Sequence, residues 1–139
     1  MYTIQTKASF DSAHFLKGYD GKCSNLHGHR WTVEVELAAE ELQSEGQCRG
    51  MVMDFSDVKE ALRAEAKRLD HSLLIEKDSL KPATMAALKD ENFKIEEFPF
   101  RPTAENFAKY FYDFMKDKGF PVSRVWVYET PNNRASYAE

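Results

Sequence analysis

Residues 23–37 read CSNLHGHRWTVEVEL, and from Trp31 onward polar and apolar residues alternate as they do in a half-buried β-strand. Alternate residues of a strand face the same side of a sheet, so His27 and His29 prolong the apolar face and are expected to point inward. Neutral imidazoles that converge in a partly buried place are readily satisfied by a divalent metal ion. The pattern therefore predicts a metal site, with zinc as the first choice. Two ordinary strand histidines bonded to backbone groups are the alternative.

A second strand is expected on the N-terminal side of this stretch. Residues 2–14 contain few turn-forming residues and end on His14, and residues 18–22 (GYDGK) form a turn signal. The two strands are therefore predicted to pair in antiparallel fashion, with Cys23 in the connecting loop. Three histidines can then meet at one end of the hairpin. For His14 alone, the spacing does not decide between a metal ligand and a polar surface residue.

Four further elements follow from helical periodicity, capping residues and β-prone runs. Asp54 and Thr103 are expected as helix N-caps, and Gly119 as the end of the second helix. The predicted elements are helices over 55–69 and from 103 to 119, and strands over 122–130 and 134–137. This order predicts an α+β fold: an antiparallel four-stranded sheet with two helices inserted between strands 2 and 3.

Residues 75–100 show little periodicity. Ser79 is expected to cap a short helix that reaches Leu88, and residues 92–100 look extended. No strand of the predicted sheet is assigned to this segment.

Composition narrows the classes of function. A chain of 139 residues with 42% hydrophobic residues is expected to form a single domain over 1–139. The net charge of −4 is spread without a basic run, so no nucleic-acid partner is expected. The sequence has no apolar run of roughly 20 residues and no apolar core of a signal peptide near its start, so we expect a cytoplasmic protein without a membrane partner.

Cys23 separates two classes of function. Three histidines leave one position of a tetrahedral zinc site open. Cys23 as the fourth ligand would close a structural site, whereas water or substrate in that position would make the site catalytic. A thiol near the metal but not bound to it suits proton transfer. The spacing does not decide between these possibilities.

Other polar residues have ordinary explanations beside functional ones. Asp70 and His71 fall at the end of the first helix, where they form either an acid-base pair or a simple helix terminus. Glu129 ends an apolar run, either as a solvent-facing acid or as an anchor for the N–H donors of a ligand. Thr103 and Glu105 are explained by helix capping alone.

Six blocks of the sequence, in order, resemble the signature of the 6-pyruvoyltetrahydropterin synthase family. The blocks are residues 10–14 (FDSAH), 23–29 (CSNLHGH), 51–55 (MVMDF), 69–71 (LDH), 102–106 (PTAEN) and 127–130 (VYET). Together they extend over nearly the whole chain.

The resemblance implies the tunnelling fold (T-fold), in which the sheets of three subunits join into a barrel and two trimers stack into a homohexamer with active sites at subunit interfaces. It also implies one Zn²⁺ per subunit and a lyase that acts on a pterin triphosphate. The implied site consists of zinc ligands His14, His27 and His29, the catalytic thiol Cys23, its relay partners Asp70, His71 and Glu129, and a pterin pocket with Glu129 as anchor and Thr103 and Glu105 in its wall.

Within the family, three residues between Cys23 and His27 are typical of the carboxy-forming branch. That branch implies conversion of 7,8-dihydroneopterin triphosphate to 6-carboxytetrahydropterin, acetaldehyde and triphosphate in queuosine biosynthesis, without a redox cofactor. The alternatives are a pyruvoyl-forming synthase, a pterin side-chain aldolase, or a non-catalytic zinc-stabilised module with Cys23 as fourth ligand. Ile75 and the long segment 76–100 depart from the family pattern. The cations considered for the triphosphate are Lys22, Arg30, Arg101 and Arg134.

Overall fold

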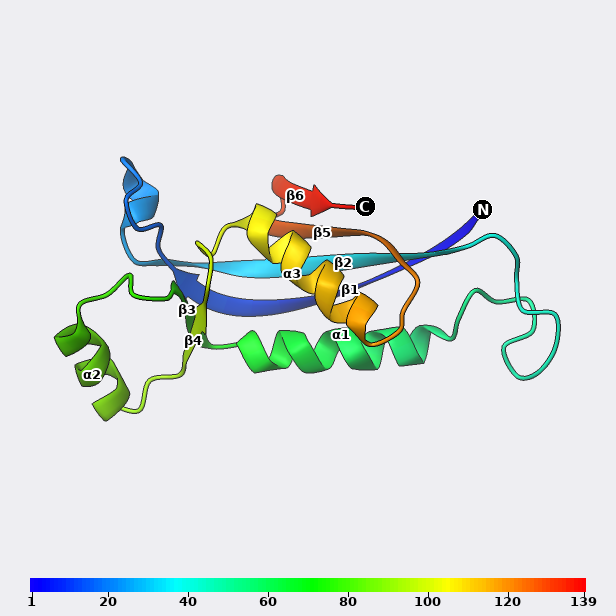
Figure 1. Cartoon of the computed structure of the whole chain (residues 1–139), viewed down its shortest axis with the longest axis horizontal. Helices are drawn as coiled ribbons and strands as arrows, with labels where there is room; N and C mark the ends of the chain where they lie inside the picture. The colour runs from blue at the N-terminus through cyan, green and yellow to red at the C-terminus, as the bar shows by residue number, and fades with distance from the viewer.

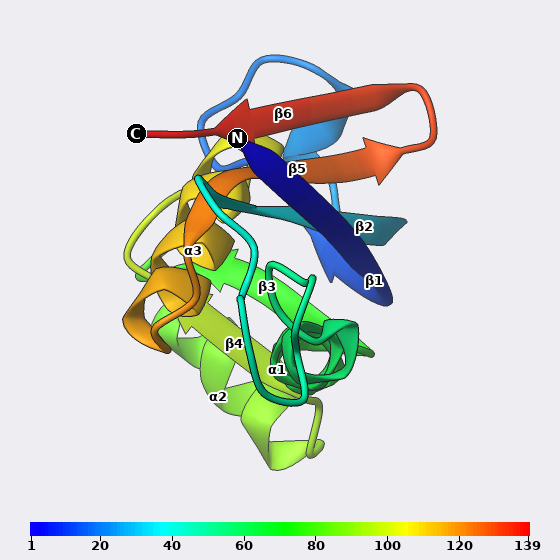
Figure 2. The same ribbon diagram turned by 90° about the vertical axis from the view of Figure 1, so that its right-hand side faces the viewer.

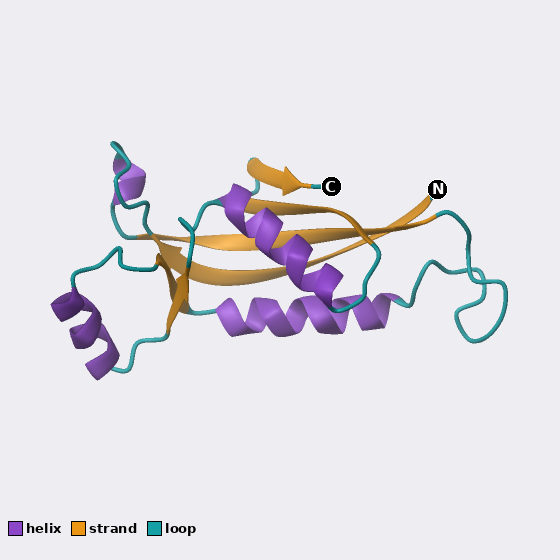
Figure 3. Ribbon diagram, in the orientation of Figure 1, coloured by secondary structure: helices purple, strands orange, loops and turns teal.

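A computed structural model describes residues 1–139, and its centre is a six-stranded mixed sheet with strand order β4-β3-β1-β2-β5-β6 (Figure 1). The strands are β1 (Tyr2–His14), β2 (His27–Ala39), β3 (Ser72–Glu76), β4 (Ile95–Phe98), β5 (Val122–Thr130) and β6 (Asn133–Tyr137). Helices α1 (Phe55–Leu69) and α3 (Ala104–Asp117) lie against one face of the sheet (Figure 3). No helix of the protein is both long enough and apolar enough to cross a membrane.

The hydrophobic core fills the space between this face and the two helices. Trp31, Val33, Val35 and Leu37 of β2 are all fully buried, whereas the residues between them are only half-buried. This is the alternation expected for a strand with one covered face. The helices contribute the buried side chains Val58, Leu62, Ala66 and Leu69 from α1 and Phe107, Ala108, Phe111 and Met115 from α3. The opposite face of the sheet carries polar and charged residues.

Both long helices begin where the sequence predicts. Asp54 caps α1 by accepting a hydrogen bond from the Ser56 N–H at 2.8 Å. Thr103 caps α3 by accepting one from the Asn106 N–H at 3.2 Å. These side chains satisfy N–H groups that have no partner within the helix. The strands predicted over 2–14 and 122–130 are found with the same bounds.

The prediction of four antiparallel strands and two helices is wrong in the region after α1. β3 pairs in parallel with the end of β1, and β4 pairs in parallel with β3, so the sheet continues beyond β1 toward α2 (Pro82–Asp90) (Figure 2). Consecutive residues Leu74 and Ile75 are both buried, so β3 shows no alternation in the sequence. Ser79 does not cap the helix, because α2 starts only at Pro82, with Lys81 in the N-cap position.

A buried carboxylate ties the helices to the added strands. Glu65 of α1 is 6% exposed, and its Oε1 accepts hydrogen bonds from Arg68 Nη2 at 2.7 Å and from the Tyr110 hydroxyl of α3 at 2.5 Å. Arg68 Nη1 also donates to Glu96 of β4 at 2.5 Å. Burial by itself raises the pKa of Glu65, but the bonds from Arg68 and Tyr110 outweigh it, so this pKa lies below its usual value.

We predict that Glu65→Gln lowers the free energy of unfolding by roughly 1–3 kcal/mol at neutral pH, because it removes the charge that Arg68 faces in a buried network. The folded-state pKa of Glu65 is below the unfolded value of about 4.5. Its contribution is therefore fully present above that value and is lost as the pH falls through the folded-state pKa. Urea denaturation of both proteins at neutral pH and at about pH 3 should show the difference shrinking in acid.

The matched control is Asp113→Asn, which removes a carboxylate from the exposed pair between Lys109 and Asp113 on α3. Exposed pairs contribute little to stability, so this variant should unfold almost like the wild type. Equal losses in the two variants would contradict a special role for the Glu65 network.

Candidate metal and pterin site

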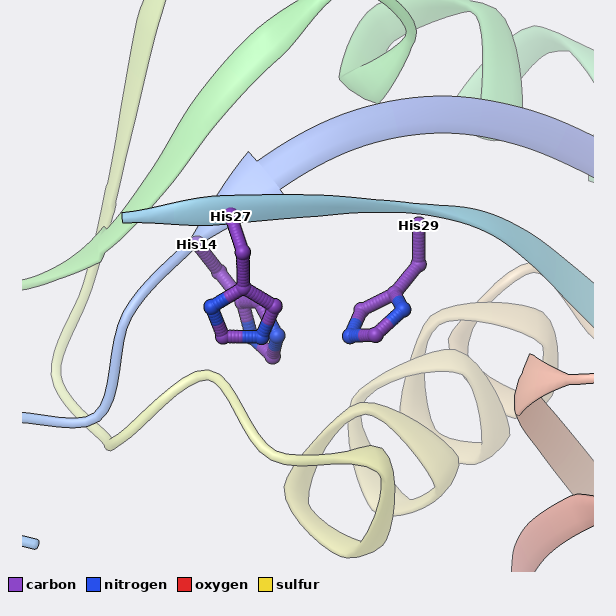
Figure 4. Close-up of side chains that lie close together, drawn as sticks. All are labelled: His14, His27 and His29. Atoms are coloured by element: carbon purple, nitrogen blue, oxygen red, sulfur yellow. The ribbon is translucent and has the colours of Figure 1, made fainter. Parts of the chain in front are cut away.

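The register of β1 and β2 brings three histidines together. His14 lies directly opposite His27, and Ser12 lies opposite His29, so the three imidazoles project from the helix-covered face at one end of the sheet (Figure 4). One ligand atom from each histidine can be chosen such that all three lie within 4.8 Å of one another. The ring centroids of His14 and His27 are 4.5 Å apart, and His29 lies 5.0 Å and 4.9 Å from them.

Backbone carbonyls orient two of the rings. His14 Nδ1 donates to the Pro102 carbonyl at 2.7 Å, and His27 Nδ1 donates to the Asn25 carbonyl at 2.7 Å. Because a carbonyl can only accept, Nδ1 carries the hydrogen and Nε2 of each neutral ring has a free lone pair. His14 Nε2 is buried and has no hydrogen-bond partner. A carbonyl-oriented imidazole with an unpartnered second nitrogen is what a metal-binding histidine requires, so the residues fit a divalent ion such as zinc.

Electrostatics keeps His14 and His29 in the form that binds metal. Burial, together with the neighbouring His27 and His29, lowers the pKa of His14 to about 4 despite the opposing effect of the Pro102 carbonyl. Burial and the neighbouring His27 also lower the pKa of His29. Both rings are therefore neutral at physiological pH and offer lone pairs without first losing a proton.

Trp31 forms an apolar wall beside the histidines. Its ring packs edge-on against His14 at 4.9 Å and against His29 at 5.5 Å, and its indole N–H donates to the Ser12 carbonyl at 3.2 Å. On the side toward α3, Trp31 meets Phe107 at 5.5 Å. This wall excludes water from one side of the site, which strengthens electrostatic interactions within it.

Glu129, at the end of β5, is the acid nearest to the histidines. Its Oε2 lies 3.9 Å from His29 Nε2, and its side chain is 31% exposed. Burial and the neighbouring carboxylate of Glu105 raise the pKa of Glu129, and His27 partly offsets this increase. Two acids, one from β5 and one from the first turn of α3, are thus close enough for their charges to repel each other. A ligand with several N–H donors would relieve their mutual repulsion.

Cys23 lies outside the group of clustered ligand atoms. It belongs to the short helical turn η1 (Lys22–Ser24) in the β1–β2 loop, and its side chain is half-buried. Its carbonyl accepts a hydrogen bond from the Leu16 N–H at 2.9 Å, which links the two sides of the loop. The three histidines form a potential metal site without its sulfur.

Asp70 and His71 form a pair at the junction of α1 and β3, and neither belongs to the group of clustered ligand atoms. His71 Nδ1 lies 2.8 Å from Asp70 Oδ2, and the His71 side chain is 79% exposed. Asp70 Oδ1 accepts the Asp11 N–H at 2.8 Å, and the His71 N–H donates to the Asp11 carbonyl at 2.6 Å. The Asp11 N–H and the His71 ring lower the pKa of Asp70. The pair is thus fixed to the edge of β1 but points to solvent within one chain.

Comparisons with known proteins identify the family of this chain. The family model for 6-pyruvoyl tetrahydropterin synthase matches residues 3–139. The chain belongs to this family. It is 35% identical to the 6-carboxy-5,6,7,8-tetrahydropterin synthase of Haemophilus influenzae over 100% of both chains, and 38% identical to that of Aquifex aeolicus over 85% of this chain and 76% of the relative.

Solved structures confirm the expected T-fold of the 6-pyruvoyl tetrahydropterin synthase family. The 6-pyruvoyl tetrahydropterin synthase of Caenorhabditis elegans superposes with a TM-score of 0.70 at 25% identity, covering 99% of this chain and 95% of that one. An uncharacterized Wolinella succinogenes protein superposes with a TM-score of 0.84 at 24% identity, covering 99% and 98% of the two chains. The relatives are named synthases, so the expectation of an enzyme is confirmed as well.

The sequence did not indicate the groups that orient the histidines of this family member. The carbonyls of Pro102 and Asn25 are backbone groups, so no residue type in the sequence indicates their role. The sequence shows that Pro102 immediately precedes the Thr103 cap. It does not show that Pro102 contacts His14, because the two residues are far apart in the chain. In contrast, strand parity predicts Trp31 on the same face as His27 and His29, and the structure confirms this position.

We predict that the purified protein binds one zinc ion per chain and that His27→Ala abolishes stoichiometric binding, because two imidazoles and water hold zinc far more weakly than three imidazoles. His71→Ala is the matched control and should retain its zinc. Zinc content after dialysis, measured by atomic emission, distinguishes the two variants. Full zinc in His27→Ala would show that His27 is not a ligand.

Proposed function

We propose that the protein is a zinc-dependent 6-carboxy-5,6,7,8-tetrahydropterin synthase, which converts 7,8-dihydroneopterin triphosphate and water to 6-carboxytetrahydropterin, acetaldehyde and triphosphate. The observation that carries the proposal is full-length similarity to relatives of that name in a chain whose three histidines converge beside Glu129. The three-residue spacing between Cys23 and His27 also favours the carboxy-forming branch over the pyruvoyl-forming one.

His14, His27 and His29 would hold the zinc ion. When bound, zinc supplies Lewis acidity toward the side-chain hydroxyls of the substrate. Burial holds His14 and His29 neutral, and the Pro102 and Asn25 carbonyls orient the rings of His14 and His27. The ligand set is thus ready before the metal arrives, which reduces the reorganisation that binding requires.

Glu129 would anchor the pterin ring. A carboxylate accepts two N–H bonds from an amidine-like edge, and such charge-assisted pairs are stronger than neutral ones. Because burial and Glu105 raise the pKa of Glu129, its charge is poorly compensated in the free protein. The ring N–H groups would supply that compensation. Thr103 and Glu105, at the start of α3, would border the same pocket.

Cys23 would move the proton at the substrate side chain, and Asp70 with His71 would set its protonation. Asp70 and His71 are not among the clustered ligand atoms, and the His71 side chain is 79% exposed within one chain. We therefore expect a second copy to bring its Asp70 and His71 to Cys23. This supports the proposed homohexamer, a dimer of trimers with sites at subunit interfaces. Consistently, β3 pairs only with residues 12–14 of β1, so the long remaining edge of β1 is free to pair with another strand.

The alternative of a pyruvoyl-forming synthase is favoured by the likeness to the Caenorhabditis elegans structure of that name. It would use the same metal site, thiol and anchor, so only the product separates the two branches. The structural zinc module with Cys23 as fourth ligand receives no support, since Cys23 is not among the clustered ligand atoms.

We predict that zinc-loaded protein incubated with 7,8-dihydroneopterin triphosphate releases 6-carboxytetrahydropterin and acetaldehyde, both identified by mass spectrometry. Cys23→Ala should keep its zinc and lose turnover by at least about a hundredfold, the usual effect of removing a proton-transferring group. Formation of 6-pyruvoyltetrahydropterin would instead assign the sister branch. Loss of zinc together with folding in Cys23→Ala would mean that the thiol is structural.

We predict further that Cys23→Ala and His71→Ala, each inactive alone, regain activity when subunits are exchanged by mild denaturation and refolding. A mixed oligomer contains some interfaces where an intact Cys23 meets an intact His71 from another chain. A Cys23→Ala,His71→Ala double variant mixed with wild type serves as the control for dilution. If the two single variants never complement each other, the relay acts within one chain and the composite site is wrong.

A further inference from the structure

Arg101 lies where the two segments that build the site meet. Its Nη2 donates to the Lys17 carbonyl at 2.6 Å, in the β1–β2 loop that also carries Cys23. The carbonyl of the next residue, Pro102, accepts the hydrogen bond from His14 Nδ1. Gly18 follows Lys17 with a φ of +81°, and a Cβ there would lie 3.5 Å from Arg101 Nη2. The guanidinium is therefore held against the backbone of the loop that follows His14.

The charge of Arg101 has no partner in the protein. It forms no salt bridge, and the bond to Lys17 uses only one of its five N–H donors. Lys17 and Lys22 of the same loop also form no salt bridge, and Asp20 is the only acid among residues 15–26. A chain with a net charge of −4 thus places three unpaired cations around this loop.

The other cations considered for the triphosphate are engaged on the opposite face of the sheet. Arg30 follows His29 on β2, so its side chain lies on the face opposite the histidines. Its Nη1 lies 3.1 Å from Asp11 Oδ2. Arg134 donates to the Tyr128 hydroxyl at 2.8 Å and lies over the Trp126 ring at 5.5 Å. Neither side chain can reach a ligand at the histidines of its own chain.

The site also has a direction. Glu129 lies against His29, whereas Pro102 and the loop lie against His14 and His27. A ligand anchored on Glu129 and passing the histidines therefore extends toward the loop and Arg101. A pterin whose side chain ends in phosphate would place its anionic end there.

We infer that Arg101, assisted by Lys17 and Lys22, forms the subsite for the triphosphate of the substrate. This inference rests on the proposed function for the identity of the ligand. A guanidinium held by one N–H keeps the others free for bidentate contact with phosphate oxygens, a geometry that a lysine ammonium does not provide. The same residue then ties phosphate binding to the loop that presents Cys23.

The test titrates zinc-loaded protein with inorganic triphosphate by calorimetry. Arg101→Gln should weaken binding by about tenfold or more, the effect of losing charge-assisted hydrogen bonds. Arg49→Gln is the matched control, since it removes the same charge from the β2–α1 loop at the other end of the molecule (Figure 1) and should change affinity less than about twofold. Arg101→Lys should recover part of the affinity.

A second ligand, 7,8-dihydroneopterin without phosphates, separates anion binding from a structural role. It should bind Arg101→Gln and wild type equally, with the zinc content unchanged. Equal losses for both ligands would mean that Arg101 only holds the loop, and the inference would be wrong. Failure of the wild type to bind inorganic triphosphate, or an equal effect of Arg49→Gln, would also overturn it. Binding that depends on Arg101 in a protein without turnover would support the subsite and reject only the proposed reaction.

Discussion

The antiparallel register between β1 and β2 is the constraint on which the site depends. The pairs run from Tyr2 opposite Ala39 to His14 opposite His27. A slip of one residue would turn one strand over, exposing its apolar residues and moving its metal ligands to the wrong face. The core and the site therefore share one constraint: the contacts that bury Trp31 and Val33 also hold the histidines in place. The strand pairing that forms the core therefore also positions the histidines.

Burial acts in opposite ways on the two kinds of titratable group in the site. It keeps His14 and His29 neutral, which is the state that binds a metal ion. It also raises the pKa of Glu129, an acid whose proposed role requires charge. The histidines are thus prepared by the apolar wall of Trp31, whereas Glu129 awaits N–H donors from a ligand. A metal ion would bind the unpartnered His14 Nε2, and the N–H groups of a pterin would compensate the charge of Glu129. Both ligands would thus stabilise the same region.

The features that the sequence predicts are those with local causes. The caps Asp54 and Thr103 define the helix starts, and the alternation after His29 defines β2. The pairing of β3 with β1 could not be predicted in this way, because Leu74 and Ile75 are both buried and parallel neighbours leave no turn signal. Ile75, which departs from the family pattern, is a core residue of this added strand. In the site, the spacing of His27 and His29 predicts that these two rings share one face, but the carbonyls that orient the rings of His14 and His27 have no residue-specific signal.

The segment from Arg101 to Asn106 connects the histidine cluster, the β1–β2 loop and α3. The Arg101 carbonyl accepts the Thr103 N–H at 2.8 Å and the Asn106 side-chain amide at 2.9 Å, while Thr103 caps α3. The chain before α3 is thus closed by its own hydrogen bonds onto the first turn of the helix. From this small rigid unit the Arg101 side chain reaches the loop with Cys23, and the Pro102 carbonyl reaches His14. Because α3 is also packed into the core through Phe107, this helix fixes the positions of His14, the β1–β2 loop and Thr103 relative to one another. The histidines, the Cys23 thiol and the Arg101 guanidinium do not bond to one another. Their relative positions are set instead by the backbone of this segment.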